Sequence, residues 1–181
     1  MHPFLSLLLL FFSATAWVRT AAVMHPNCHL KSQSTKQALE LASLRSVDAR
    51  QAVQDFQRKG GASYSVLYLQ DGPAGGTCVV FIQRSATRFT RYAYRAHRVD
   101  STSVVSTRLP RPLAQVPRGC YFTLCESISI PSVYRVLVVK QGKQVKGGLS
   151  STDFVAQDFT AVDQARLAPA VALIRVLDNE Y

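Results

Sequence analysis

The sequence predicts an α+β fold, a mostly antiparallel sheet of about five to seven strands with an N-terminal helix and a C-terminal helix packed on it. Three observations support this prediction. The chain has 181 residues, of which 48% are hydrophobic and 18% charged, enough for one domain with a buried core. Helical patterns of apolar residues occur in residues 35–59 and in the region after residue 160. Between these two regions lie several short β-rich runs separated by turns.

The N-terminus has the form of a secretion signal. An apolar run extends from Phe4 to Phe12, and Ala14-Thr-Ala16 follows with the small-x-small pattern of a cleavage site. The run is too short for an ordinary transmembrane helix. It departs from the usual signal-peptide pattern in one respect, because no Lys or Arg precedes it. A second cleavage frame ends at Ala22. The alternative is a buried or interfacial N-terminal helix.

The secretion signal sets the expected organisation of the chain. We expect the protein to be secreted or extracytoplasmic, with no transmembrane segment after processing. The expected segments are a signal peptide at 1–22 (cleaved near 16 or 22), a flexible mature N-terminus at 23–34 and a single α+β domain at 35–181.

Export also favours disulfide bonds. Cys28, Cys78, Cys120 and Cys125 are even in number and allow two disulfides with three connectivities. We expect at least one disulfide, and the alternative for Cys78, within the apolar run CVVFI, is a buried thiol. The chain has no Asn-x-Ser/Thr sequence, so an N-glycan is not expected.

The first helical region is in two pieces that could be continuous. Ala38, Leu41 and Ala42 share one helical face, and the same spacing resumes after Ser46. Gly60-Gly61 ends the region.

The β-rich runs follow in order. Residues 62–70 and 77–83 predict a hairpin around the turn-rich stretch 71–76. Both strands are apolar on both faces, which predicts central positions covered by the preceding helix. Three further β-rich runs and one after a turn are expected at 101–107, 119–127, 133–140 and 144–149. The proline-broken segment 109–117 is expected to be a loop, neither a central strand nor a helix.

A last helix is predicted near the C-terminus. Thr160-Ala-Val-Asp163 has the form of a capping box, with Asp in place of the usual Glu. Pro169 is expected to end or kink this helix, so that residues 170–181 are either helix or a last strand.

Positive charge is the most unusual feature of the composition. Lys and Arg number 21 against 11 acids, a net charge of +10 that favours anionic partners. Five arginines lie within RSATRFTRYAYRAHR, residues 84–98, which contains no acid. Between Pro73 and Cys125 the single acid is Asp100. Such a concentration differs from an ordinary solvated face, which mixes both signs.

The arginine-rich stretch has two possible conformations. As a helix it would place all five arginines on one face. As a strand it would distribute them over both faces, beside tyrosines on which guanidinium groups can stack. The Thr, Phe and Tyr content and the β-rich neighbours favour the strand.

We predict an anion-binding surface from these residues, with a second basic cluster at a predicted hairpin turn. The candidate residues are Arg84, Arg88, Arg91, Arg95, Arg98, Tyr92, Tyr94, Lys140, Lys143 and Lys146. The alternative is that the arginines only protect an exposed strand from pairing with other chains, and that the lysines only solubilise the turn.

Motifs for catalysis are weak. His97, the one histidine in the expected folded region, and Glu126, a lone acid in an apolar strand, are the two candidates for a catalytic group, and neither has a recognisable partner in the sequence. His25 would form a Cu(II) or Ni(II) site only if cleavage after Ala22 made it the third residue. The glycine-rich turns lack the Lys-Ser/Thr of phosphate loops. We therefore expect no cofactor and no metal site, with His25 as the one metal-ligand candidate that depends on the cleavage position.

The function that the sequence predicts is an exported, non-catalytic basic binding module. Its anionic partner would be a sulfated or phosphorylated glycan, an acidic protein or a membrane surface. Export argues against sequence-specific nucleic-acid binding. The alternatives are a small secreted hydrolase and a secreted inhibitory or structural module. The partner's identity, the disulfide pairing and the oligomeric state are left open.

Overall fold

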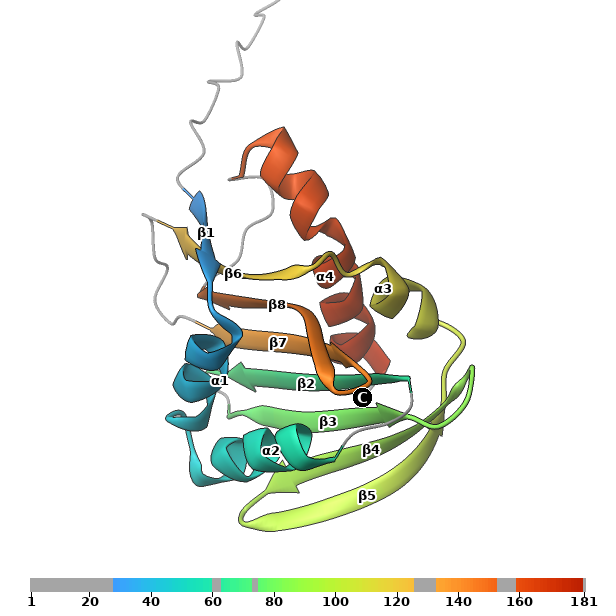
Figure 1. The fold of residues 1–181 in the computed structure, drawn as a ribbon. Helices are drawn as coiled ribbons and strands as arrows, with labels where there is room; N and C mark the ends of the chain where they lie inside the picture. Colours follow the sequence, from blue (N-terminus) through green and yellow to red (C-terminus); the bar gives the residue numbers. More distant parts are fainter. Residues whose placement is uncertain (1–27, 60–62, 73–74, 126–132, 153–158, 181) are drawn as a thin grey trace, which may run out of the picture.

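The computed structural model describes residues 28–59, 63–72, 75–125, 133–152 and 159–180 (Figure 1). In this part of the chain, eight strands form one sheet in the order β1-β6-β8-β7-β2-β3-β4-β5. The strands are β1 Cys28–Gln33, β2 Tyr64–Asp71, β3 Thr77–Gln83, β4 Arg88–Arg95, β5 Arg98–Val105, β6 Gly119–Cys125, β7 Tyr134–Gln141 and β8 Gln144–Thr152. The helices are α1 Thr35–Ser43, α2 Val47–Arg58, α3 Pro110–Gln115 and α4 Ala161–Glu180.

The α+β class is confirmed, with helices at both ends of the chain, but the sheet differs from the prediction in two ways. The described residues form eight strands, where five to seven were expected. The sheet is also mixed, because β6 and β8 are parallel while the other neighbouring strands are antiparallel. The parallel pair arises because β8 folds back beside β7 and lies between β7 and β6.

Strand β1 lies in the segment that was expected to be flexible. It pairs with β6 along its whole length, from Cys28 opposite Cys125 to Gln33 opposite Cys120. Its sequence, CHLKSQ, has little apolar character, and the pairing with β6 supplies the strand conformation.

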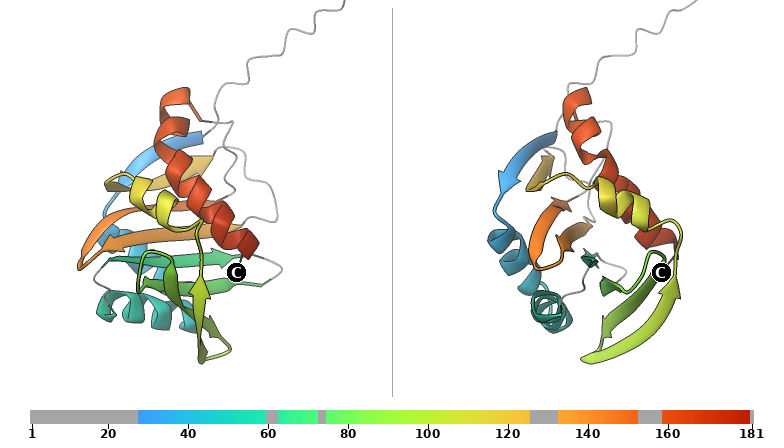
Figure 2. Two further views of the ribbon diagram at one scale, coloured as in Figure 1. Left: turned by 90° about the vertical axis from the view of Figure 1, so that its right-hand side faces the viewer. Right: turned by 45° about the vertical axis from the view of Figure 1, so that its right-hand side comes forward.

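Helices cover both faces of the sheet (Figure 2). On one face, α1 and α2 pack on alternate residues of the central strands, such as Leu67 and Val80. On the other face, α3 and α4 pack on the residues between them, such as Val66 and Phe81. Both sets of side chains are buried, which explains why β2 and β3 are apolar at almost every position.

The arginine-rich stretch forms strands, as favoured from its composition. β4 and β5 are joined by a two-residue turn in which Ala96 and His97 have φ of 47° and 64°. These positive φ values identify the left-handed turn that matches the twist of a β-hairpin. The helical alternative, with its single ridge of five arginines, is therefore wrong.

One of the two predictions about proline is wrong. The segment expected to be a loop contains α3, in which Pro110 and Pro112 lie in the first turn. Proline is compatible with this position because the first N–H groups of a helix have no partner within it. Pro169 does not end α4, which continues to Glu180, so of the two alternatives for residues 170–180 the helix is confirmed and the last strand is wrong. Its N-terminus has the predicted cap, since the Thr160 hydroxyl accepts the Asp163 N–H at 3.2 Å.

Among the described helices, none has the length and apolar character that a membrane crossing requires.

Candidate anion-binding surface

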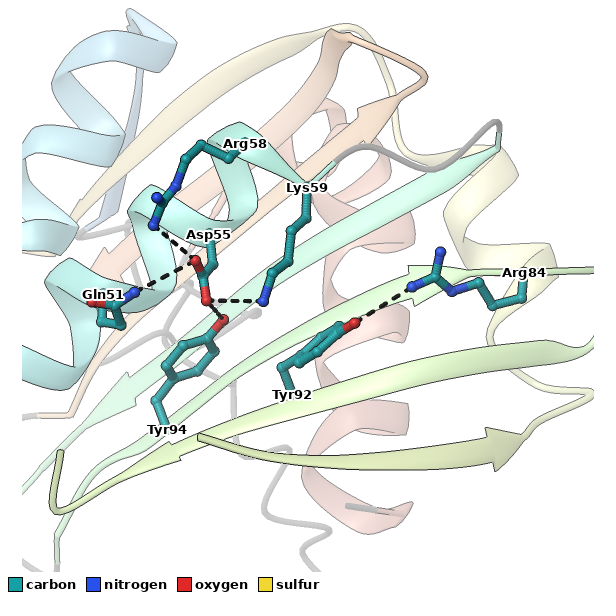
Figure 3. Close-up of polar contacts among 7 residues, drawn as sticks. All are labelled: Gln51, Asp55, Arg58, Lys59, Arg84, Tyr92 and Tyr94. Atoms are coloured by element: carbon teal, nitrogen blue, oxygen red, sulfur yellow. Dashed lines mark hydrogen bonds and ion pairs between the residues drawn. The ribbon is translucent and has the colours of Figure 1, made fainter. Parts of the chain in front are cut away.

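Two segments far apart in the sequence meet around Tyr92 (Figure 3). From the end of α2, the Lys59 ammonium lies 4.2 Å from the centroid of the Tyr92 ring. From the loop between β3 and β4, the Arg84 guanidinium donates to the Tyr92 hydroxyl at 3.4 Å and to Thr90 Oγ1 at 3.0 Å. Tyr92 therefore orders two cations at once, one over its ring and one at its hydroxyl.

Strand alternation adds Arg88 to the same face. Residues 88, 90, 92 and 94 of β4 point toward α2, and Arg88 is exposed. We call the set formed by Lys59, Arg84, Arg88, Thr90 and Tyr92 the Tyr92 surface.

Asp55 of α2 lies beneath this surface and is only 6% exposed. Its Oδ2 accepts from Lys59 Nζ at 3.1 Å and from the Tyr94 hydroxyl at 2.9 Å. Its Oδ1 accepts from Arg58 at 3.1 Å and from Gln51 at 3.4 Å. The carboxylate thus fixes Lys59 in the position where it contacts Tyr92.

Opposing effects set the pKa of Asp55. Burial raises the pKa, but the hydrogen bonds from Lys59 and Tyr94, together with the charges of Lys59 and Arg58, outweigh burial and hold the pKa below its usual value of 3.8. Asp55 is therefore ionised at neutral pH. Its single negative charge offsets only part of the positive charge of Arg58, Lys59, Arg84 and Arg88, and the Arg58 side chain is 67% exposed. The surface as a whole is positive.

The sheet divides the five predicted arginines between its two faces. Arg84 and Arg88 belong to the Tyr92 surface. Arg91, Arg95 and Arg98 lie on the face that α3 and α4 cover elsewhere, with Arg95 and Arg98 directly opposite each other. Asp100 points to that second face too, opposite Ala93. The five arginines do not form one continuous site.

The predicted lysine cluster is also divided. Lys140 is 5% exposed, and its ammonium donates to the carbonyl oxygens of Phe56 and Gln57 at the end of α2. The Lys146 ammonium donates to the carbonyls of Leu113 and Ala114 at the end of α3, at 3.1 and 2.6 Å. Both lysines therefore cap helix C-termini.

Two further residues of the predicted anion-binding surface, Lys143 and Tyr94, differ in their exposure to solvent. Lys143 remains exposed near the β7–β8 turn. Tyr94 is 2% exposed and points to Asp55, so it supports the surface from below and offers no ring to a partner.

Of the two catalytic candidates, the structure describes His97, which contacts no Ser or Cys side chain among the described hydrogen bonds. The His97 side chain is 74% exposed, with its Nδ1 3.9 Å from Asp48 Oδ1, and the same carboxylate oxygen accepts the His97 backbone N–H at 2.9 Å. These contacts attach the β4–β5 turn to α2. Burial and the charge of Asp48 raise the pKa of Cys78 to about 12, so this thiol stays protonated at neutral pH.

Glu126 and His25 lie outside the described residues. Within the described ranges, no three His, Cys, Asp or Glu side chains gather in a way that could hold a metal ion.

Sequence reasoning missed Lys59, Arg58 and Asp55. The only signal was local: Arg58 and Lys59 follow Asp55 by three and four positions at a helix end, the spacing at which side chains on a helix meet. Nothing in this spacing indicates that Lys59 lies over Tyr92, because the two residues come from different elements.

Comparison with known proteins adds no assignment: no family model matches the chain, and neither the curated proteins nor the solved structures contain a match.

Proposed function

We propose that the protein is an exported, non-catalytic binding module whose Tyr92 surface holds an anionic partner. One observation carries the proposal: Lys59 and Arg84, from different elements, are both held against Tyr92 by contacts within the protein. Asp55 fixes Lys59, and Thr90 fixes Arg84. Cations that are ordered before binding lose less conformational entropy when a partner arrives, which favours affinity.

The chemistry of the surface suits sulfate, phosphate and carboxylate groups. Guanidinium groups such as those of Arg84 and Arg88 bind these anions through two parallel hydrogen bonds. The candidate partners are thus sulfated or phosphorylated glycans, acidic proteins and anionic membrane surfaces. The net charge of +10 would draw any of them toward the protein over long range. The proposal includes a partner outside the cytoplasm, because a secretion signal is predicted at 1–22.

The test uses heparin as a generic polyanion, with elution from a heparin column by a salt gradient. We compare the wild type with Arg84→Ala/Arg88→Ala. The matched control is Arg111→Ala/Arg175→Ala, which removes the same charge from exposed positions on α3 and α4. The proposal expects the first pair to elute at clearly lower salt than the control pair, because site contacts contribute beyond net charge.

Two results would contradict the proposal. Equal shifts for the two double variants would show that retention follows net charge alone. Elution of the wild type at low salt would show that the protein binds the polyanion only weakly, which contradicts an anion-binding surface.

A further inference from the structure

Within the described part of the chain, strand β5 forms an edge of the sheet. It pairs with β4 and is the last strand in the sheet order. Seven of its eight positions are exposed, and Val104 is half-buried. Natural edge strands are commonly protected from pairing with other chains by lysines, prolines or bulges. β5 contains no lysine and no proline, and its register with β4 is continuous, without a bulge. Its charged residues, Arg98 and Asp100, both lie near the turn, which leaves residues 101–105 uncharged.

The direction of the edge hydrogen-bonding groups follows from the hairpin. In a hairpin closed by a two-residue turn, the residues that flank the turn, Arg95 and Arg98, are hydrogen-bonded to each other. The direction then alternates along an antiparallel strand. The backbone groups that point away from β4 therefore belong to Val99, Ser101, Ser103 and Val105. A ninth strand could pair with these groups.

Positive charge lies beside this edge on both faces. Arg88 of β4 is exposed on the Tyr92 face, while Arg95 and Arg98 are exposed on the other. The middle of β5 carries short side chains, with Ser101 opposite Tyr92 and Ser103 opposite Thr90. A strand added to β5 would lie about 10 Å from β4. This distance is within the combined reach of an arginine and a glutamate side chain that cross above the serines.

We propose that the anionic partner is an acidic polypeptide segment in extended conformation, which adds to β5 as a ninth strand and places its carboxylates beside Arg88 on one face and Arg95 and Arg98 on the other. This inference rests on the proposed anion-binding function and names its partner class. Backbone pairing supplies affinity, and carboxylate contacts supply selectivity. A glycan has no peptide groups for such pairing. A second copy of this chain would meet the repulsion of two net charges of +10.

The test uses a fluorescent peptide of eight residues, the length of β5, with the repeat Glu-Glu-Thr-Thr, which places glutamates on both faces of an extended strand. Its binding is followed by anisotropy. Ser103→Pro removes an outward N–H without changing charge, at an edge position where proline is tolerated. Ser103→Ala is the matched control, which removes the hydroxyl but keeps the N–H. We expect Ser103→Pro to weaken peptide binding at least about tenfold and Ser103→Ala to change it less than about twofold. Heparin retention should be the same for both.

A second measurement covers the case in which Ser103→Pro does not fold, as judged by circular dichroism. A peptide methylated on the backbone nitrogens of one edge cannot pair along that edge. Methylation of one of the two edges should abolish binding to the wild type, and methylation of the other should not.

The outcomes separate the two proposals. If the folded Ser103→Pro variant, or both methylated peptides, bind as well as their controls while heparin is retained, strand addition is overturned and anion binding stands. If sedimentation shows a dimer that Ser103→Pro converts to a monomer, a second copy occupies β5 and the acidic-peptide proposal is overturned. If neither peptide nor heparin binds, both proposals fail.

Discussion

The hydroxyl of Tyr94 donates a hydrogen bond of 2.9 Å to Oδ2 of Asp55, the same oxygen that accepts from Lys59. This contact joins β4 to α2 inside the protein, since both residues are almost fully buried. One carboxylate oxygen thus serves the packing of the helix on the sheet and the position of a surface cation. The geometry of the Tyr92 surface is therefore coupled to the stability of the fold.

We predict that Tyr94→Phe is destabilising. The substitution keeps the ring and removes one donor from a buried, charged acceptor, which should lower the free energy of unfolding by about 1.5 to 3 kcal/mol. Urea denaturation measures this value. Tyr92→Phe is the control, because the Tyr92 hydroxyl is near the surface and its bond to Arg84 is long, at 3.4 Å. Equal effects of the two substitutions would contradict the role given to Asp55.

We predict that the contribution of Asp55 to stability is lost in acid. Its pKa in the folded protein is lower than 3.8, the value expected for the unfolded chain. A group with a depressed pKa stabilises the fold above its unfolded value and loses this effect as the pH falls through the folded value. The difference in unfolding free energy between wild type and Asp55→Asn should thus be largest at neutral pH and become smaller as the pH falls below 3.8. A difference that stays constant with pH would contradict the assignment.

Local patterns were sufficient for the elements whose apolar residues are dense. α1, α2, β2 and β3 follow the predicted ranges closely, because their periodicity or apolar runs decide the conformation locally. β1 was missed because its polar residues form a strand only through pairing with β6. α3 was missed because prolines that exclude a helix interior are acceptable in its first turn.

The candidate site was predictable only in part. The excess of arginine led to Arg84 and Arg88, and Tyr92 followed from its position in the same arginine-rich stretch. The positive charge of a lysine does not indicate which groups its ammonium contacts in the folded protein. Lys140 and Lys146 were therefore assigned to an anion-binding surface, although both cap helix C-termini. The contact of Lys59 with Tyr92 depends on how α2 lies across the sheet, and that arrangement is set by packing between distant segments.

We predict that Ala96→Gly stabilises the protein. Ala96 has a φ of 47°, in the left-handed region where a Cβ atom is strained. Glycine removes this strain but loses more backbone entropy on folding than alanine does. With both effects included, we expect the free energy of unfolding to rise by about 0.5 to 1 kcal/mol. Ala86→Gly, at an exposed position without positive φ, is the control and should be neutral or slightly destabilising. A loss of stability in Ala96→Gly would show that the turn is not strained.

We predict that Lys140 is structural and Lys143 is not. Lys140→Met leaves the carbonyl oxygens at the end of α2 without their donor, which should cost about 1 to 3 kcal/mol of unfolding free energy. Lys143→Met, at an exposed position beside the turn, should change stability by less than about 0.5 kcal/mol. Thermal and urea denaturation of both variants give the comparison. Similar stability of the two variants would mean that Lys140 contributes as little as an exposed lysine.

We predict a disulfide between Cys28 and Cys125. The two residues are directly opposite in the β1–β6 register, at a separation of about 4.5 to 5.5 Å between Cα atoms that suits a disulfide. Cys78 and Cys120 are free and buried, and burial raises the pKa of each thiol, that of Cys78 to about 12. Iodoacetamide at mildly alkaline pH should therefore label these two thiols slowly in the native protein and rapidly after unfolding, because the thiolate is the reactive form. Peptide mapping without reduction should recover one linked pair of peptides containing Cys28 and Cys125. A link from either residue to Cys78 or Cys120 would contradict the strand register, in which Cys78 is opposite Leu69 and Cys120 is opposite Gln33.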